Sequence, residues 1–344
     1  MKMKRKGIKN IILLMLTSLS AACFCGCGKE QYPDEKQILK EIPEDKKLVI
    51  YTSHKKEVYE PVISEFEERT GIWVDVHTGG TMELMEEIRS SENTEADIMF
   101  GGGVESYETF RDCFEVYSCK EKDKIKKEFR NDEDIWTSFT ELPIVFIYNE
   151  KLVSEEMVPK CWNELLELKW TGKIAFADPL NSGSSCTALE TMVKVTGDKD
   201  IIEKFYNHLV GRQSPGSGYV IDEVSKGRAL IGITLEETAL KAIDAGRDIE
   251  IVYPEDGTSA IPDGCAVVKN AFHQENARLF IDFIISSDIQ NLASKNLYRR
   301  SVRNDIVDEK ENINIVNFNI KEAVYEQKQI LEQWKRLNAG KEKR

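Results

Sequence analysis

The amino-acid sequence predicts an α/β protein with two domains. Short apolar runs alternate with segments whose apolar residues recur at helical spacing, as in a sheet whose strands are connected by helices. A chain of 344 residues is long enough for two domains of ordinary size. Its 41% of hydrophobic residues is typical of a globular protein with a buried core.

The first domain is predicted from three apolar runs, which we interpret as strands at residues 48–51, 73–77 and 96–100. Helices are predicted between them, at residues 58–68 and 82–89. The apolar residues of the first of these helices recur at helical spacing, at Val58, Val62, Ile63 and Phe66. Strands and helices therefore alternate through this part of the chain.

The second domain shows the same alternation. Its strands are predicted at residues 141–148, 173–177 and 229–233, and its helices at residues 187–195, 199–209 and 220–226. An apolar run at residues 249–253 is followed by several proline and glycine residues and then by a second apolar run at 265–269. We expect the chain to return here from the second domain to the first. The last predicted helices are residues 274–286, 288–294 and 320–337. We therefore expect an N-terminal lobe of residues 47–141 and 262–337 and a C-terminal lobe of residues 142–261.

Clusters of small polar residues follow five of the predicted strands. They lie at residues 52–54, 78–81, 101–103, 178–185 and 234–236. Strands of an open α/β sheet bind ligands in the crevice beyond their carboxyl ends. Backbone N–H groups, hydroxyls and helix N-termini that gather there suit a small anion. The pattern therefore predicts a binding site rather than a catalytic one.

The first 26 residues have the features of a secretory signal. They include five basic residues, no acidic residue, and an apolar run that is too short to span a bilayer. Gly26 before Cys27 resembles the processing site of a bacterial lipoprotein, and Cys23 is the alternative. We therefore expect a lipoprotein signal peptide at residues 1–26 and a tether at residues 27–46. A diacylated cysteine would anchor the protein to the outer face of the cytoplasmic membrane, in the cell envelope or periplasm.

Charge and motifs exclude several classes of function. The formal net charge is -13. Without the five basic residues of the signal segment the chain has 42 basic and 60 acidic residues, so its net charge becomes -18. Such a surface repels nucleic acid. The four histidines are dispersed and neither CxxC nor HExxH occurs, so we expect no metal site and no cofactor. Because no G-x-S-x-G elbow is present, we expect a binding protein and not an enzyme.

The strongest candidate for anion binding is the run Ser182, Gly183, Ser184 and Ser185. It precedes a predicted helix, so its hydroxyls and free backbone N–H groups can hold a phosphate, a phosphonate or a carboxylate. Ordinary helix capping would use the same residues. Residues 78–81 repeat the arrangement without the lysine and hydroxyl that end a P-loop.

Three further residues are candidates for ligand contact. Ser53 and His54 directly follow the first predicted strand, although a single histidine is often structural. Glu236 would accept hydrogen bonds from ligand hydroxyls, and a capping or solvated carboxylate is the other interpretation. The glycines at 101–103 would allow a ligand to approach the backbone closely.

Several segments resemble the bacterial extracellular solute-binding proteins of ABC importers, in the branch that contains ferric-iron, aminoethylphosphonate, phosphoglycerate and sugar-phosphate binders. They are LVIYTSH at residues 48–54, FEERTGI at 66–72, GGT at 79–81, ADI at 96–98, WNEL at 162–165, WTGKI at 170–174, ADP at 177–179 with the residues up to 185, YPEDGT at 253–258 and PDG at 262–264. The resemblance extends over residues 47–305.

The resemblance implies a type II periplasmic-binding-protein-like fold, in which two α/β lobes close on a ligand about a hinge. The residues that would line the first lobe are Ser53, His54, Thr81 and Gly102. Those that would line the second are Ser182, Gly183, Ser184, Ser185 and Glu236. Such a protein delivers a small solute to the permease subunits of an ABC importer, and we expect it to be a monomer.

The resemblance also favours one class of ligand. Iron binders of this branch carry adjacent tyrosines in the second lobe, whereas this chain has no Tyr-Tyr pair and only Tyr219 lies near the expected stretch. Sugar-phosphate binders place a carboxylate after a strand like residues 231–234, as Glu236 is placed here. We therefore expect a phosphorylated sugar or another organophosphate or phosphonate. Ferric-iron binding, and presentation of a ligand to a sensor kinase, remain the alternatives.

Overall fold

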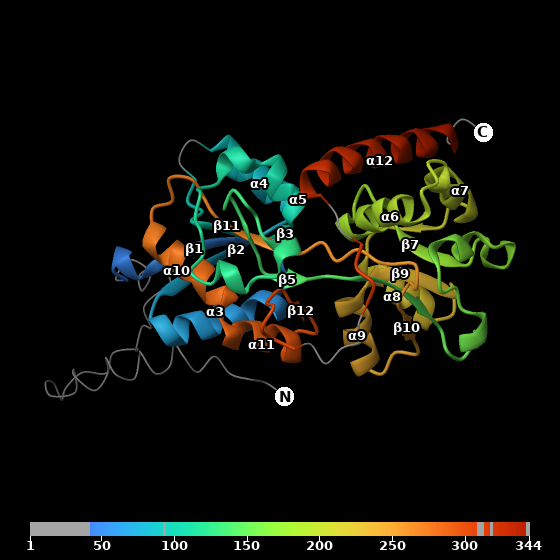
Figure 1. Ribbon diagram of the computed structural model, residues 1–344, viewed down its shortest axis with the longest axis horizontal. Helices are drawn as coiled ribbons and strands as arrows, with labels where there is room; N and C mark the ends of the chain where they lie inside the picture. Colours follow the sequence, from blue (N-terminus) through green and yellow to red (C-terminus); the bar gives the residue numbers. More distant parts are fainter. Residues whose placement is uncertain (1–41, 92–93, 308–312, 317–318, 342–344) are drawn as a thin grey trace, which may run out of the picture.

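The computed structural model describes residues 42–91, 94–307, 313–316 and 319–341. Figure 1 shows two lobes, each with helices around a sheet, that are joined by extended segments. The C-terminal helix α12 (Ile320–Lys341) begins beside α5 of the first lobe and runs along the second lobe (Figure 1). The α/β fold class predicted from the sequence is confirmed.

The first lobe contains a five-stranded sheet in the order β2-β1-β3-β11-β4. Its strands are β1 (Lys47–Thr52), β2 (Trp73–Thr78), β3 (Ile98–Gly103), β4 (Thr137–Ser138) and β11 (Asp263–Val267). β1 pairs in parallel with β2 and β3, and β11 runs antiparallel to β3. The carboxyl ends of β1, β2 and β3 therefore lie at one edge of the sheet, next to the beginning of β11.

The second lobe contains a five-stranded sheet in the order β10-β6-β9-β7-β8. Its strands are β6 (Ile144–Tyr148), β7 (Ile174–Ala177), β8 (Gln213–Ser214), β9 (Ile231–Leu235) and β10 (Glu250–Val252). β7 is parallel to both β8 and β9, and β6 is antiparallel to β9. The carboxyl ends of β7 and β9 thus share one edge.

Helices connect the strands of both sheets. In the first lobe they are α3 (Lys56–Thr70), α4 (Thr81–Ser90), α5 (Val104–Thr109), α10 (Gln274–Ile285) and α11 (Ser287–Asn296). In the second lobe they are α6 (Gly183–Thr196), α7 (Ile201–His208), α8 (Gly218–Ser225) and α9 (Glu236–Asp244). Short 3-10 helices lie at Glu44–Lys46, Arg111–Cys113, Lys122–Lys124, Lys127–Phe129, Glu155–Met157, Trp162–Leu166 and Leu168–Trp170.

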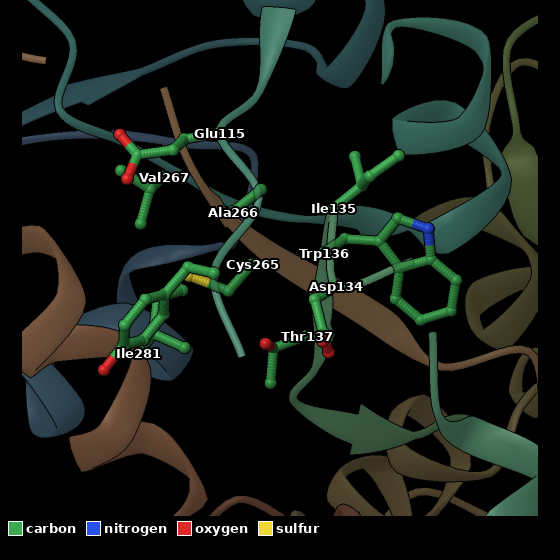
Figure 2. Close-up of a pocket in the computed structure, with 10 residues that line it drawn as sticks. Glu115, Asp134, Ile135, Trp136, Thr137, Cys265, Ala266, Val267 and Ile281 are labelled. Carbon is green, nitrogen blue, oxygen red and sulfur yellow. The ribbon is translucent and has the colours of Figure 1, made fainter. Parts of the chain in front are cut away.

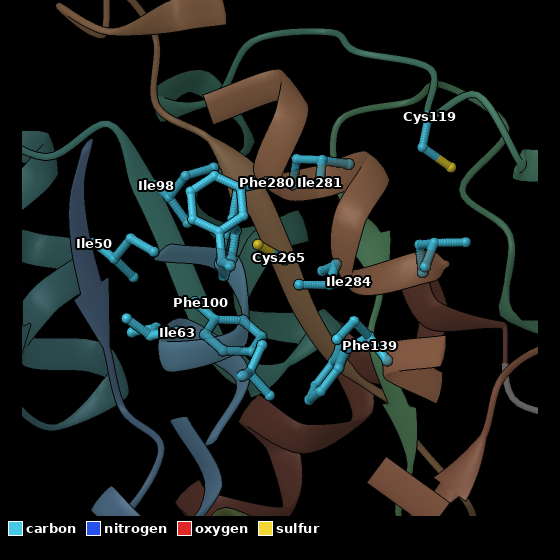
Figure 3. Close-up of a cluster of buried hydrophobic side chains, with 14 of the residues drawn as sticks. Ile50, Ile63, Ile98, Phe100, Cys119, Phe139, Cys265, Phe280, Ile281 and Ile284 are labelled. Atoms are coloured by element: carbon cyan, nitrogen blue, oxygen red, sulfur yellow. The ribbon is translucent and has the colours of Figure 1, made fainter. Parts of the chain in front are cut away.

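Each lobe has a hydrophobic core of its own. In the first lobe the rings of Phe100, Phe139 and Phe280 pack edge to face between the sheet and α10, as Figure 3 shows. In the second lobe Trp162 packs against the sheet and Phe176 packs against α7. Two separate cores allow each lobe to be rigid while the segments between them bend.

Two passages in the described part of the chain run between the sheets of the two lobes. One is the passage from β4 to β6, which includes the short strand β5 (Thr140–Glu141). The second is the passage from β10 to β11, and the short strand β12 (Arg300–Ser301) pairs with β5 beside them. These paired crossings form the hinge region of the molecule.

The helix α12 differs from the expectation that residues 320–337 belong to the N-terminal lobe. Its beginning does pack on the first lobe, where Ala323 is buried. Farther along, Ile330 and Trp334 are buried in the core of the second lobe. α12 contacts α5 of the first lobe and α6 and α7 of the second, so it belongs to both.

Candidate functional site

The ends of β1 and β3 and the start of α4 bring three predicted residues together in the first lobe. Gly102 has a φ of +84°, and a Cβ there would lie 2.4 Å from the Thr81 side chain. Gly101 has a φ of +103°, and a Cβ there would lie 2.9 Å from the His54 ring. Thr81 and His54 therefore pack directly against glycine backbone, which a residue with a side chain would prevent. Ser53 precedes His54 and is half-buried.

The His54 imidazole is buried and uncharged. Its side chain is 5% exposed and lies against the edges of the rings of Phe100 and Phe139. Its Nε2 atom is 3.2 Å from Oδ2 of Asp263. Burial, followed by the positive charge of Arg299, holds the pKa of His54 well below its usual value. At neutral pH His54 therefore brings no positive charge to an anion.

The N-terminus of α6 is the part of the second lobe best suited to an anion. Ser182 is the N-cap, and its hydroxyl accepts a hydrogen bond from the backbone N–H of Ser185 at 3.3 Å. The hydroxyls of Ser184 and Ser185 lie 3.1 Å from the same oxygen. Gly183 is exposed and has open space around it. The first turn contains no acidic residue of its own that would compensate the positive end of the helix dipole.

The N-terminus of α4 is less suited to an anion than the sequence suggested. The Glu83 carboxylate accepts a hydrogen bond from the backbone N–H of Gly80 at 3.2 Å. The N–H of Gly79 donates to the Thr52 carbonyl at 3.3 Å. A carboxylate of the protein therefore already occupies the positive end of this helix. Residues 78–81 do not repeat the arrangement found at the N-terminus of α6.

Glu236 begins α9 and is engaged within the protein. It is 1% exposed, and Nε and Nη2 of Arg300 donate to its two oxygens, each at 2.8 Å. The Tyr253 hydroxyl donates to Oε1 at 2.6 Å. The sequence predicts that the Glu236 carboxylate contacts ligand hydroxyls, but in the structure it binds Arg300 and so connects β12 to the second lobe. A ligand hydroxyl would have to share an oxygen that already accepts a hydrogen bond.

A second buried network lies beside this pair and connects the two lobes. Oε2 of Glu237 is 2.8 Å from Nη2 of Arg299, and Nη1 of Arg299 contacts Oδ2 of Asp263. Oδ1 of Asp263 accepts hydrogen bonds from the backbone N–H and the hydroxyl of Thr140, both at 2.7 Å. Nε2 of His54 lies 3.2 Å from the same Oδ2 atom of Asp263 that Arg299 contacts. Contacts therefore continue from α9 in the second lobe to the end of β1 in the first.

Glu237, Arg299 and Asp263 are not among the site residues predicted from the sequence. The one signal for them was the adjacent pair Arg299-Arg300, directly after the end of α11. Their carboxylate partners are distant in the sequence, so only the three-dimensional fold shows that these arginines are buried and paired.

The candidate lipidation residues Cys27 and Cys23 lie outside the described residues. Within the described ranges, no helix is both long enough and apolar enough to cross a bilayer. Among the same residues, no group of three or more His, Cys, Asp and Glu side chains is placed to hold a metal ion.

Two hollows in the structure contain none of the predicted site residues. One lies in the first lobe beside β11, where Trp136, Cys265 and Ile281 are among the lining residues (Figure 2). The other is on the second lobe beside α8 and is lined in part by Arg212 and Tyr219. The predicted residues instead lie at or directly after the carboxyl ends of strands in the two lobes.

Two α/β lobes with paired crossings, and with polar groups at the carboxyl ends of strands in both, define a protein with the type II periplasmic-binding-protein fold. Residues 107–321 match the bacterial extracellular solute-binding protein family, and the chain belongs to this family. The protein is therefore a solute-binding protein of the ABC-importer type, as the sequence resemblance implied.

Comparisons with individual proteins agree with this assignment. Iron uptake protein A1 of Synechocystis is 24% identical over 323 residues, which cover 88% of this chain and 87% of that protein. The periplasmic binding protein AfuA of Actinobacillus pleuropneumoniae, solved with exogenous fructose-6-phosphate bound, has a TM-score of 0.74 and 21% identity over 84% of this chain and 97% of its own. A solved protein described as a two-component system protein that mediates signal transduction has a TM-score of 0.75 and 22% identity over 83% of this chain and 99% of its own.

Proposed function

We propose that this protein captures a phosphorylated sugar, or a related organophosphate or phosphonate, and delivers it to the permease subunits of an ABC importer. The observation that carries the proposal is the N-terminus of α6. Its serine hydroxyls, the exposed Gly183 and a first turn without acidic residues leave N–H groups available for a phosphate. The fructose-6-phosphate bound in AfuA supports the same class of ligand.

The first lobe would contact the uncharged part of such a ligand. His54 is neutral, and the N-terminus of α4 is already compensated by Glu83. Hydroxyl groups of a sugar suit the half-buried Ser53 and Thr81 at this end of the sheet. The two half-sites thus have different chemistry, with the anion on the second lobe and the hydroxyls on the first.

Calorimetry with a panel of ligands tests this proposal. We expect glucose 6-phosphate or another organophosphate to bind, and we expect ferric citrate to give no heat of binding. Phosphoglycerate and 2-aminoethylphosphonate complete the panel and distinguish sugar phosphates from other organophosphates and phosphonates. Ferric iron is supported by the name of the Synechocystis relative, and binding of ferric iron alone would exclude an organophosphate ligand.

A charge introduced at the N-terminus of α6 tests the position of the anion. Ser184→Asp places a carboxylate where the phosphate would bind, so we expect the affinity for the organophosphate to be lost. Ser287→Asp is the matched control, because Ser287 is an exposed residue at the first position of α11, outside the proposed site. Equal binding by both variants would place the anion elsewhere.

The structural similarity to a two-component system protein supports the alternative role in signalling. Deletion of the gene distinguishes the two roles. Loss of uptake of radiolabelled glucose 6-phosphate indicates transport, whereas unchanged uptake with loss of a transcriptional response to the solute indicates presentation to a sensor kinase.

Membrane attachment through a diacylated cysteine is part of the proposal. Growth in radiolabelled palmitate should label the protein, and Cys27→Ser should remove the label. A Cys27→Ser protein that is still labelled would move the anchor to Cys23.

A further inference from the structure

Arg299 is a buried cation that touches both lobes. The residue is 6% exposed and follows the last helix of the first lobe, α11. Its Nη2 atom is 2.8 Å from Oε2 of Glu237 on α9, and its Nη1 atom contacts Oδ2 of Asp263 on β11. The same Oδ2 atom is 3.2 Å from Nε2 of His54. One guanidinium therefore lies between an element of the second lobe and a candidate ligand-binding residue of the first.

We propose that Arg299 is a positioning residue for solute binding, which holds the Asp263–His54 pair in place at the end of β1 and connects it to α9 of the second lobe. The inference rests on the proposed function, because it takes His54 to be part of the binding site. Arg299 itself is not proposed to touch the solute.

The charges around His54 explain why this arrangement matters. The charged groups that act on the imidazole are Asp263, Arg299, Glu237 and Lys241. Lys241 pairs with Glu237, and Arg299 satisfies Asp263, so the carboxylate beside His54 is already neutralised. Without the guanidinium, the buried Asp263 carboxylate would face the imidazole alone, and the pair would take up a proton on the imidazole ring.

The connection to α9 gives Arg299 a second role. Rotation of the lobes about the hinge moves Glu237 relative to Asp263, so the guanidinium cannot keep both contacts unchanged in every orientation. The position of His54 in the first half-site is therefore coupled to the orientation of the second lobe.

Histidine NMR titration and calorimetry together test the role of Arg299. In the unaltered protein we expect the His54 ring to stay neutral through neutral pH. In Arg299→Gln we expect its pKa to rise by about 1 to 3 pH units, because the cation that compensates Asp263 is gone. We expect the affinity for glucose 6-phosphate to fall about 10- to 100-fold, the range for residues that orient ligand-binding histidines in metal sites.

Arg303→Gln is the matched control. Arg303 is also buried and also joins two carboxylates, with its Nη1 atom 2.5 Å from Glu121 and its Nε atom 2.8 Å from Asp305. The partners of the Arg303 side chain are Glu121, Asp305 and the carbonyl of Ile285, and none of them belongs to α9 or contacts His54 in the described structure. We expect this variant to lose stability while the His54 titration and the affinity for glucose 6-phosphate stay unchanged.

Glu237→Gln tests the contact of Arg299 with the second lobe separately from its contact with Asp263. It is also the variant to use if Arg299→Gln does not fold. It removes the charge from the contact with the second lobe, and so weakens that contact, but leaves Arg299 on Asp263; we therefore expect weaker binding with a neutral His54. An unchanged His54 titration in Arg299→Gln, or an altered one in Arg303→Gln, would overturn the proposal. If no ligand of the panel binds the unaltered protein, the proposed function fails, and the titrations still decide whether Arg299 positions His54.

Discussion

Glu190 shows how a single buried residue can lower the stability of this fold. It lies on α6 and is 1% exposed, and within the described part of the chain neither of its carboxylate oxygens has a hydrogen-bond partner. Burial, followed by the charge of Glu105, raises the pKa of Glu190 to about 9. The folded protein therefore holds a proton at neutral pH that the unfolded chain releases.

We expect Glu190→Gln to stabilise the protein at neutral pH. A carboxyl whose pKa is raised on folding favours the folded state fully below its unfolded pKa, near 4.5, and this stability is lost as the pH rises toward 9. The amide has the same shape and does not titrate. Urea unfolding should give the variant an advantage of about 1–3 kcal/mol at pH 7.5 and little or none at pH 4.5. If the free energy of unfolding changed with pH in the same way in both proteins, the Glu190 carboxyl would not be buried in the folded state.

Gly102 is a residue whose backbone conformation permits the first half-site. Because its φ is +84° and a Cβ would lie 2.4 Å from Thr81, Gly102→Ala should lower the free energy of unfolding by about 1–3 kcal/mol. Chemical denaturation measures the loss. Gly340→Ala near the end of α12 meets open space and is the control, where we expect no loss and a gain of at most about 1 kcal/mol from helix propensity. Adding Thr81→Ser removes the methyl group nearest the new Cβ and should restore part of the stability.

At the scale of elements, periodicity predicted the long helices well, because their buried faces repeat along the sequence. The helix expected at residues 58–68 is α3 (Lys56–Thr70), and the one expected at 82–89 is α4 (Thr81–Ser90). The strand expected at 141–148 is divided into β5 and β6, because Pro143 has no N–H for a ladder and a crossing begins there.

Two helices were missed for a physical reason. α5 (Val104–Thr109) and α9 (Glu236–Asp244) begin directly in the polar clusters that follow β3 and β9. In the sequence these clusters have the composition of ligand-contacting loops, which hides the helical character of the residues that follow them. The same limit applies to the site: local sequence showed the serines that cap α6, whereas the partners of Glu236 and His54 come from segments far away in the chain.

The helix α12 yields a prediction at this scale. Trp334 is fully buried in the core of the second lobe, with its ring 5.0 Å from Tyr206 and 6.0 Å from Phe176. Trp334→Ala should lower the free energy of unfolding by about 3–5 kcal/mol, as expected for a buried aromatic side chain. Tyr325→Ala on the same helix removes a side chain that is 66% exposed, so its effect in the same denaturation experiment should stay within about 0.5 kcal/mol. Equal losses would mean that α12 does not pack as described.

At the scale of the whole molecule, the position of the site follows from the two cores and the crossings between them. Each lobe is rigid around its own core, and the ends of β1, β3 and β9 meet beside the hinge through the contacts of Asp263 and Arg299. A solute that contacts the N-terminus of α6 and the end of β1 at once would favour the orientation in which both are within reach. Binding of the solute and closure of the hinge are then thermodynamically coupled.

We therefore expect a bound organophosphate to make the molecule more compact. Small-angle X-ray scattering should show a smaller radius of gyration with saturating glucose 6-phosphate, because contacts to both lobes stabilise the closed orientation. Ser184→Asp should show no such change at the same ligand concentration, since the second half-site is blocked. Glu237→Gln should need more ligand to reach the same compaction, because the contact through which α9 constrains His54 loses its charge and is weaker. Calorimetric binding without any compaction would mean that the solute contacts one lobe only, and the residues of the other lobe would then have no part in recognition.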